Sequence, residues 1–312
     1  MRTLADFRIF YNQSIAPELI NLEKRRQRLM RLFGLSALLL LGILFLQIYI
    51  GIFFITLILL LFVGGWIAYL VFRTRVWLDE YKPRVVGLIL DFIDDGINYG
   101  TLKYKQKGKI DKSKFLSGRI FTTADEYLAE DHISGKIREM PFEICELRVR
   151  EFSPARTRLD KVFEGLFLVG DFHRLELQGS LLLLPDAYRK YLSRSERAFH
   201  RLGGRRVRHN LLPVFETYFD TYATDKVRLH DVLSPDLQNA ILTFRQTYAD
   251  KNRNKDIYLS IIGDNLFIAL SQNRDLLDPN LFKPSVNFDQ VLEFYDDLRM
   301  VFELVEMLDV MN

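Results

Sequence analysis

The sequence is poor in cysteine and lacks the common catalytic and nucleotide-binding motifs. Cys145 is the only cysteine among 312 residues, so the chain can form neither an internal disulfide nor a cysteine-rich metal site. This usage is typical of a protein in a reducing compartment. Glycine-rich phosphate-binding loops and the Gly-x-Ser-x-Gly turn of hydrolases are also absent, so no motif predicts nucleotide binding or a nucleophilic serine.

Charge is missing from residues 32–72, where 41 consecutive residues include no Asp, Glu, Lys, Arg or His. One helix of that length would measure about 60 Å, roughly twice the thickness of a bilayer's hydrocarbon core. We therefore predict a transmembrane hairpin, with helices near 32–48 and 52–72 and a minimal turn around Gln47, Tyr49 and Gly51. A buried hairpin in a large soluble protein is the alternative, although the block is longer than a core helix needs.

Basic side chains flank this block on both sides. Because positive residues remain on the cytoplasmic side, we expect a multi-pass protein with both termini in the cytoplasm. The same side chains are candidate contacts for anionic lipid headgroups, and the alternative is that they only determine topology. The candidates are Lys24, Arg25, Arg26, Arg28 and Arg31 before the block, and Arg73 and Arg75 after it.

The net charge of +3 is unevenly distributed. Residues 1–31 contain seven basic and three acidic side chains, a net charge of +4, which leaves −1 for the rest of the chain. A nearly neutral remainder favours contact of the basic arm with lipid over a nucleic-acid partner, so we expect no nucleic acid to bind.

Residues after the apolar block show the patterns of a mixed α and β fold. Alternation around Cys145 and the apolar run 162–169 predict an antiparallel meander of about four strands between 131 and 184. Two apolar runs around Gly263-Asp264-Asn265 predict a hairpin, and residues 215–222 resemble a strand. Helical spacing through 288–311 predicts a long C-terminal helix.

These patterns together predict the α+β class. We expect an amphipathic helical arm over 1–31, in which Leu4, Phe7, Tyr11 and Ile15 share one face, and a transmembrane hairpin over 32–72. Two cytoplasmic α+β lobes follow, over 73–204 and 205–312.

Candidate catalytic groups are few. Asp131 and His132 are adjacent, and neighbouring residues of a strand point to opposite faces, which disfavours a shared metal. Asp171 and His173 lie two positions apart beside a strand end, where both side chains can face the same way. These four residues are the candidates for a hydrolase site; no metal site and no cofactor is expected.

Two further stretches have alternative interpretations. The basic run 201–209 is suited to phosphate, lipid headgroups or RNA, and the alternative is a solvated loop. The aromatic side chains of 215–222 are suited to base stacking, or equally to the core side of a strand.

Five segments together resemble a known bacterial membrane family, Domain of Unknown Function 3137. They read FYNQSIAPELINLEKRRQRL, EDHISGKI, VFEGLFLVGDF, FETYFDTYATD and IYLSIIGDNLFIAL, and the most specific are 162–172 and 215–225. The resemblance covers almost the whole chain and implies a bacterial inner-membrane protein. It implies no activity, so no residue inherits a catalytic role from it.

The leading hypothesis is a non-enzymatic tether, in which the hairpin anchors an interaction or self-assembly domain at the membrane. Its partners would be the lipid bilayer and another membrane or cytoplasmic protein, or a second copy of the chain. The alternatives are a membrane-bound hydrolase built on the Asp and His residues above, and an anionic-lipid sensor using 24–31 and 201–209.

Overall fold

The computed structural model describes residues 3–51, 53–171, 179–186, 190–207, 211–225, 227, 229–249, 256–271, 277–284 and 287–310. They form two compact units, and each is described by itself. The helical unit contains Arg2–Phe92 and Leu276–Glu293, and the sheet unit contains Ile93–Asp275 and Phe294–Asn312. This division differs from the ranges expected from sequence, because both 73–204 and 205–312 contribute strands to one sheet.

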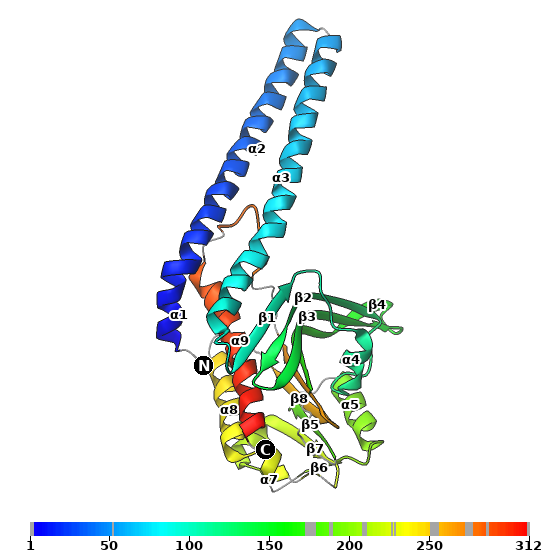
Figure 1. Cartoon of the computed structure of the whole chain (residues 1–312). Helices are drawn as coiled ribbons and strands as arrows, with labels where there is room; N and C mark the ends of the chain where they lie inside the picture. Colours follow the sequence, from blue (N-terminus) through cyan, green and yellow to red (C-terminus); the bar gives the residue numbers. More distant parts are fainter. Residues whose placement is uncertain are drawn as a thin grey trace. The chain divides into compact units, whose positions relative to one another are not determined.

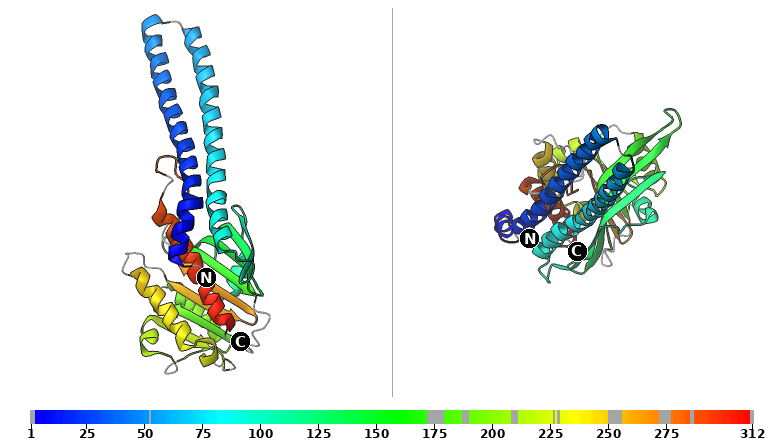
Figure 2. Two further views of the ribbon diagram at one scale, coloured as in Figure 1. Left: turned by 60° about the vertical axis from the view of Figure 1, so that its left-hand side comes forward. Right: turned by 90° about the horizontal axis from the view of Figure 1, so that it is seen from above.

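Two long helices dominate the helical unit and lie alongside each other (Figures 1 and 2). Short α1 and the π-helical turn η1 lead directly into α2, and α3 returns after a tight turn. Gly51 adopts a left-handed conformation (φ +71°), and its N–H donates to the Gln47 carbonyl at 2.9 Å, which ends α2. The bounds are Leu4–Phe10 for α1, Tyr11–Ile15 for η1, Ala16–Ile50 for α2 and Phe53–Ile93 for α3.

The predicted pair of helices at 32–72 is confirmed, and both helices extend beyond that block. Their apolar side chains point outward: Leu38 is 66% exposed, Phe45 73% and Leu61 73%. Leu4–Tyr49 and Phe53–Ile93 are long and apolar enough to cross a membrane, which suggests membrane association.

The N-terminal arm, residues 3–31, packs against α3 of the same unit. Thr3 caps α1 by accepting a hydrogen bond from the Asp6 N–H at 3.2 Å. On the predicted apolar face Phe7, Tyr11 and Ile15 are buried, whereas Leu4 remains exposed. Phe7 contacts Phe92 edge to face, with 5.4 Å between ring centroids.

Among the described residues, the sheet unit contains nine strands in the order β1-β2-β3-β4-β9-β8-β5-β7-β6, with antiparallel neighbours throughout. The strands are Tyr99–Lys105 (β1), Glu126–Ile137 (β2), Met140–Ser153 (β3), Arg158–Asp171 (β4), Ser180–Pro185 (β5), Arg205–Arg206 (β6), Phe219–Ala223 (β7), Ile257–Ile262 (β8) and Asn265–Ser271 (β9).

The predicted meander is confirmed for β2, β3 and β4, with β1 added before them. The strand near 181–184, β5, does not follow β4 in the sheet, because the β8–β9 hairpin lies between them. Both strands of that hairpin are buried on both faces, which suits a central position.

The bounds of the remaining helices correct one prediction. Pro213 begins α6, so 215–218 is helical and only β7 is strand, against the strand expected over 215–222. Ser234 Oγ accepts a hydrogen bond from the Leu237 N–H at 3.2 Å and caps α8. The helices are Lys112–Ser117 (α4), Lys190–His200 (α5), Pro213–Tyr218 (α6), Leu229–Val232 (α7), Pro235–Ala249 (α8) and Phe288–Val310 (α9).

An aromatic core lies between the sheet and α4. Phe115 stacks on Phe121 at 5.3 Å and meets Phe167 edge to face at 5.0 Å. Cys145 is fully buried in the same cluster. A different set of rings joins the sheet to α9, where Phe302 contacts Phe142 at 5.1 Å.

Candidate functional site

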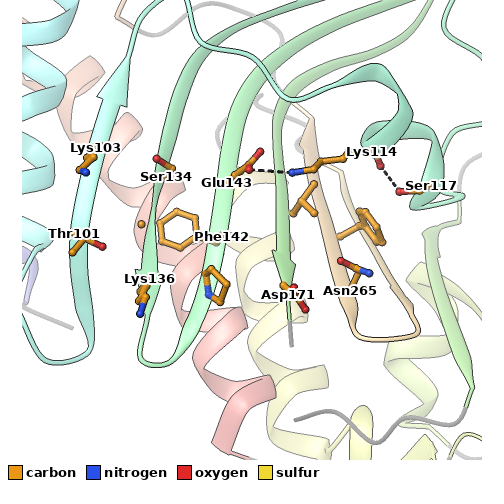
Figure 3. A pocket seen from close by; sticks show the side chains of 14 residues that line it. Thr101, Lys103, Lys114, Ser117, Ser134, Lys136, Phe142, Glu143, Asp171 and Asn265 are labelled. Carbon is orange, nitrogen blue, oxygen red and sulfur yellow. Dashed lines mark hydrogen bonds and ion pairs between the residues drawn. The ribbon is translucent and has the colours of Figure 1, made fainter. Parts of the chain in front are cut away.

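A polar trough crosses the sheet beside α4 and encloses about 670 Å³ (Figure 3). It has contributions from β1, β2, β3, β4, β9 and α4, so it depends on the whole sheet rather than on one motif. Its lining residues are Thr101, Lys103, Lys114, Ser117, Ser134, Gly135, Lys136, Pro141, Phe142, Glu143, Val169, Asp171, Asn265 and Phe267.

Strand register assembles the trough. One continuous line of cross-strand partners runs from β1 to β9: Lys103, Ser134, Glu143, Val169 and Phe267. A second line lies two residues along each strand, where Lys136 pairs with Pro141 and Asp171 with Asn265. Because side chains alternate along a strand, residues two positions apart share a face, and both lines open to the same side.

Positive charge predominates in the trough, with three lysines against two carboxylates. Lys114 donates to Glu143 Oε1 at 3.0 Å, and this contact joins α4 to β3 (Figure 3). Among the described residues, neither Lys103 nor Lys136 has an acidic partner. The β1 and β2 side of the trough is therefore suited to an anionic group, whereas Asp171 and Asn265 provide acceptors on the β4 and β9 side.

Asp131 and His132 lie at a β-bulge in β2, where the register with β3 shifts between Glu130 and Ile133. Asp131 is buried at φ +56° and accepts a hydrogen bond from the Tyr104 hydroxyl. His132 instead contacts Glu143, with 3.7 Å between Nε2 and Oε2. The two candidates therefore have different partners.

Asp171 is not brought next to this pair. Sheet register places it level with Lys136, about four residues, or about 13 Å, further along the strands and two strands, or about 10 Å, across from His132. His173 lies outside the described residues. No group of three metal-binding side chains occurs within the described part of the chain.

The seven candidate lipid contacts are not equivalent. Arg26 is only 9% exposed, donates to the Leu281 carbonyl at 2.6 Å and pairs with Glu23. The hydrogen bonds that Arg26 donates to the Glu23 carboxylate raise the pKa of the Arg26 guanidinium. Arg25 is paired with Glu80 at 3.1 Å. The exposed candidates are Lys24, Arg25, Arg28, Arg31, Arg73 and Arg75.

The two remaining sequence candidates have structural roles where they are described. Phe215 and Phe219 stack at 4.9 Å and are buried, as is Tyr222. These three rings form core contacts, whereas Tyr218 is 36% exposed and its ring lies against the Arg245 guanidinium, 4.8 Å from the ring centroid. In the basic run, Arg206 pairs with Asp220, while Arg208 and His209 lie outside the described residues.

The trough was not found from the sequence. Its lysines and serines are spread over 101–143, a region that local patterns describe only as polar strand and loop. The available signal was two pairs of polar residues spaced two apart, Thr101 with Lys103 and Ser134 with Lys136. This spacing does not identify a site until the pairing of the strands is known.

Residues 161–310 match a family model described as "Protein of unknown function (DUF3137)". The chain carries a DUF3137 segment. This segment begins in β4 and ends in α9, so it includes Asp171, Asn265 and Phe267 of the trough but none of its lysines. No curated protein and no solved structure matches the chain. The family description assigns no activity.

Proposed function

We propose that this protein is a membrane-anchored binding protein, in which α2 and α3 hold the sheet unit at a bilayer surface and the trough binds a partner. The observation that carries the proposal is the outward-facing apolar surface of two helices without a charge between 32 and 72. Burial of that surface in lipid removes it from water and needs no protein cover.

The membrane in this proposal is the inner membrane of a bacterial cell, with both termini in the cytoplasm. Basic residues on both flanks of the apolar block support this orientation. A single buried cysteine is compatible with a reducing compartment.

The partner in this proposal is an extended acidic segment of another protein. Lys103 and Lys136 supply positive charge next to β1, an end strand of the sheet. An end strand has backbone groups available for an added strand, and the adjacent trough can accept alternate side chains of that strand. A second copy of the chain is the other occupant to be tested.

A binding role is favoured over a catalytic one because charged side chains of the trough are exposed to water. Lys114 and Glu143 pair with each other, and side-chain exposures of 50% and 35% leave both in contact with water. The Asp and His candidates do not converge among the residues described. The hydrolase alternative therefore has no specific observation in its favour.

Affinity purification of the full chain in gentle detergent tests this proposal. Lys103→Glu with Lys136→Glu should lose the retained partner, whereas Lys107→Glu with Lys112→Glu, which changes exposed lysines outside the trough, should retain it. Quantitative mass spectrometry identifies the partner, and mass photometry detects a second copy. A monomeric protein without a retained partner, or equal retention by both variants, would contradict the proposal.

A further inference from the structure

A second cavity lies within the helical unit, between α2 and α3, and encloses about 950 Å³. Its lining changes character along its length. One end has the guanidinium groups of Arg25, Arg28 and Arg73, and the other has the rings of Phe62 and Trp66. We refer to this cavity as the interhelical groove.

Helical spacing aligns the groove with the helix axes. On α3, Phe62, Trp66, Tyr69 and Arg73 follow at steps of four, three and four residues, so they share one face. The twelve residues from Phe62 to Arg73 are separated by eleven helical steps and span about 16 Å of helix. The groove therefore runs from the apolar block to its basic flank. Along α3, Tyr69 lies between Trp66 and Arg73, and the ring centroids of Trp66 and Tyr69 are 5.8 Å apart.

The basic end of the groove has more positive than negative side chains. Arg25 is paired with Glu80 at 3.1 Å, but Arg28 and Arg73 have no acidic partner in the described part of the chain. A planar guanidinium donates two parallel hydrogen bonds to phosphate, which makes arginine well suited to this anion. Two such groups, one from each helix, face a single opening.

We propose that the interhelical groove binds one anionic phospholipid, with its phosphate at Arg28 and Arg73 and an acyl chain against Phe62 and Trp66. The groove has the polarity of such a lipid, charged at one end and apolar at the other, and a volume within the usual range for ligand sites. This site is distinct from the trough, and it differs from general attraction of a basic flank to an anionic surface because it depends on particular arginines.

The chain contains a convenient probe, because its two tryptophans, Trp66 and Trp77, both line the groove. The full chain is reconstituted in vesicles of phosphatidylcholine with a minor fraction of brominated lipid, whose bromines quench tryptophan fluorescence on contact. Brominated phosphatidylglycerol should quench more strongly than brominated phosphatidylcholine at the same fraction. A Trp66→Phe variant should lose most of the difference, because Trp77 is buried.

Matched charge variants separate a site from diffuse attraction. Arg28→Gln with Arg73→Gln should weaken the preference for the anionic lipid by about tenfold or more. Arg31→Gln with Arg75→Gln removes two charges from the same flanks, at exposed positions outside the groove, and should leave the preference nearly unchanged. Circular dichroism in the same vesicles verifies that both variants are folded.

Several outcomes would overturn this proposal. Equal quenching by the two brominated lipids would exclude a headgroup preference. Equal loss in both arginine pairs would indicate general electrostatic attraction. Displacement of the brominated phosphatidylglycerol by soluble glycerol phosphate would show a site for free phosphate rather than for a lipid, whereas persistence of the quenching supports the lipid.

Discussion

At the residue scale, the hydroxyl of Thr56 forms a hydrogen bond between the two long apolar helices, α2 and α3. Its Oγ1 donates a hydrogen bond to Gln47 Oε1, which connects α3 to α2 near their turn. Thr56→Val should lower the stability of the hairpin by about 0.6–2 kcal/mol, since such bonds in a membrane have that range. Thermal unfolding in detergent measures the change.

Thr74 supplies the control for this prediction. Its hydroxyl donates only to the Leu70 carbonyl of the same helix, at 2.9 Å. Thr74→Val should therefore change the stability less than Thr56→Val does. Equal effects of the two substitutions would mean that the contact between helices contributes nothing.

Cys145 gives a prediction about pH. Burial raises the pKa of its thiol from 9.0 to about 12. A folded-state pKa above the unfolded value means that the neutral thiol stabilises the fold below pH 9, and that this contribution is lost as the pH rises from about 9 to about 12. Denaturation midpoints measured across that window, for the native chain and for Cys145→Ala, should converge as the pH rises.

The same burial protects Cys145 from reagents. At neutral pH the folded chain should react with maleimide far more slowly than the unfolded chain, because the thiolate is the reactive form and the side chain is buried. Rapid modification without unfolding would contradict the packing of this cluster.

At the element scale, the β2 bulge depends on a glycine. A Cβ at Gly108 would lie 2.5 Å from the Cβ of His132, so that Gly108→Ala forces one of them to move. We expect a loss of about 1–3 kcal/mol of stability, as for other overpacked sites. Gly100→Ala is the control, because a Cβ there meets nothing within 4 Å. Chemical denaturation of both variants tests this difference.

Elements with a strong local pattern were predictable. The β8–β9 hairpin follows from apolar alternation around Gly263, and α9 follows from unbroken helical spacing after Phe288. The short helix α6 was missed, because its six residues contain too few turns to show a helical period. Its aromatic residues are interspersed with polar ones, a pattern that is typical of a strand. Pro213 favours a helix there, because its fixed φ suits the first helical turn.

At the scale of the whole molecule, topology is the property to test. Single cysteines replace Asn12, Lys107 or Tyr49 in the native chain. Cys145 can remain in place, because it is buried and should not react with the label. Asn12→Cys and Lys107→Cys should label from the same side of the membrane, and Tyr49→Cys, 85% exposed near the turn, from the other side. Labelling of Asn12→Cys and Lys107→Cys from opposite sides would exclude a hairpin.

The sequence by itself determined the two apolar helices and the turn between them, because the length and hydrophobicity that a membrane helix needs can be read from consecutive residues. It also determined the mixed α and β class through local periodicity. Only the tertiary structure decided the strand order, the trough and the interhelical groove. Gly165 pairs with Ser271, more than a hundred positions away, and Arg28 faces the same cavity as Arg73 from another helix. Such pairings depend on packing across the fold, which no local pattern records.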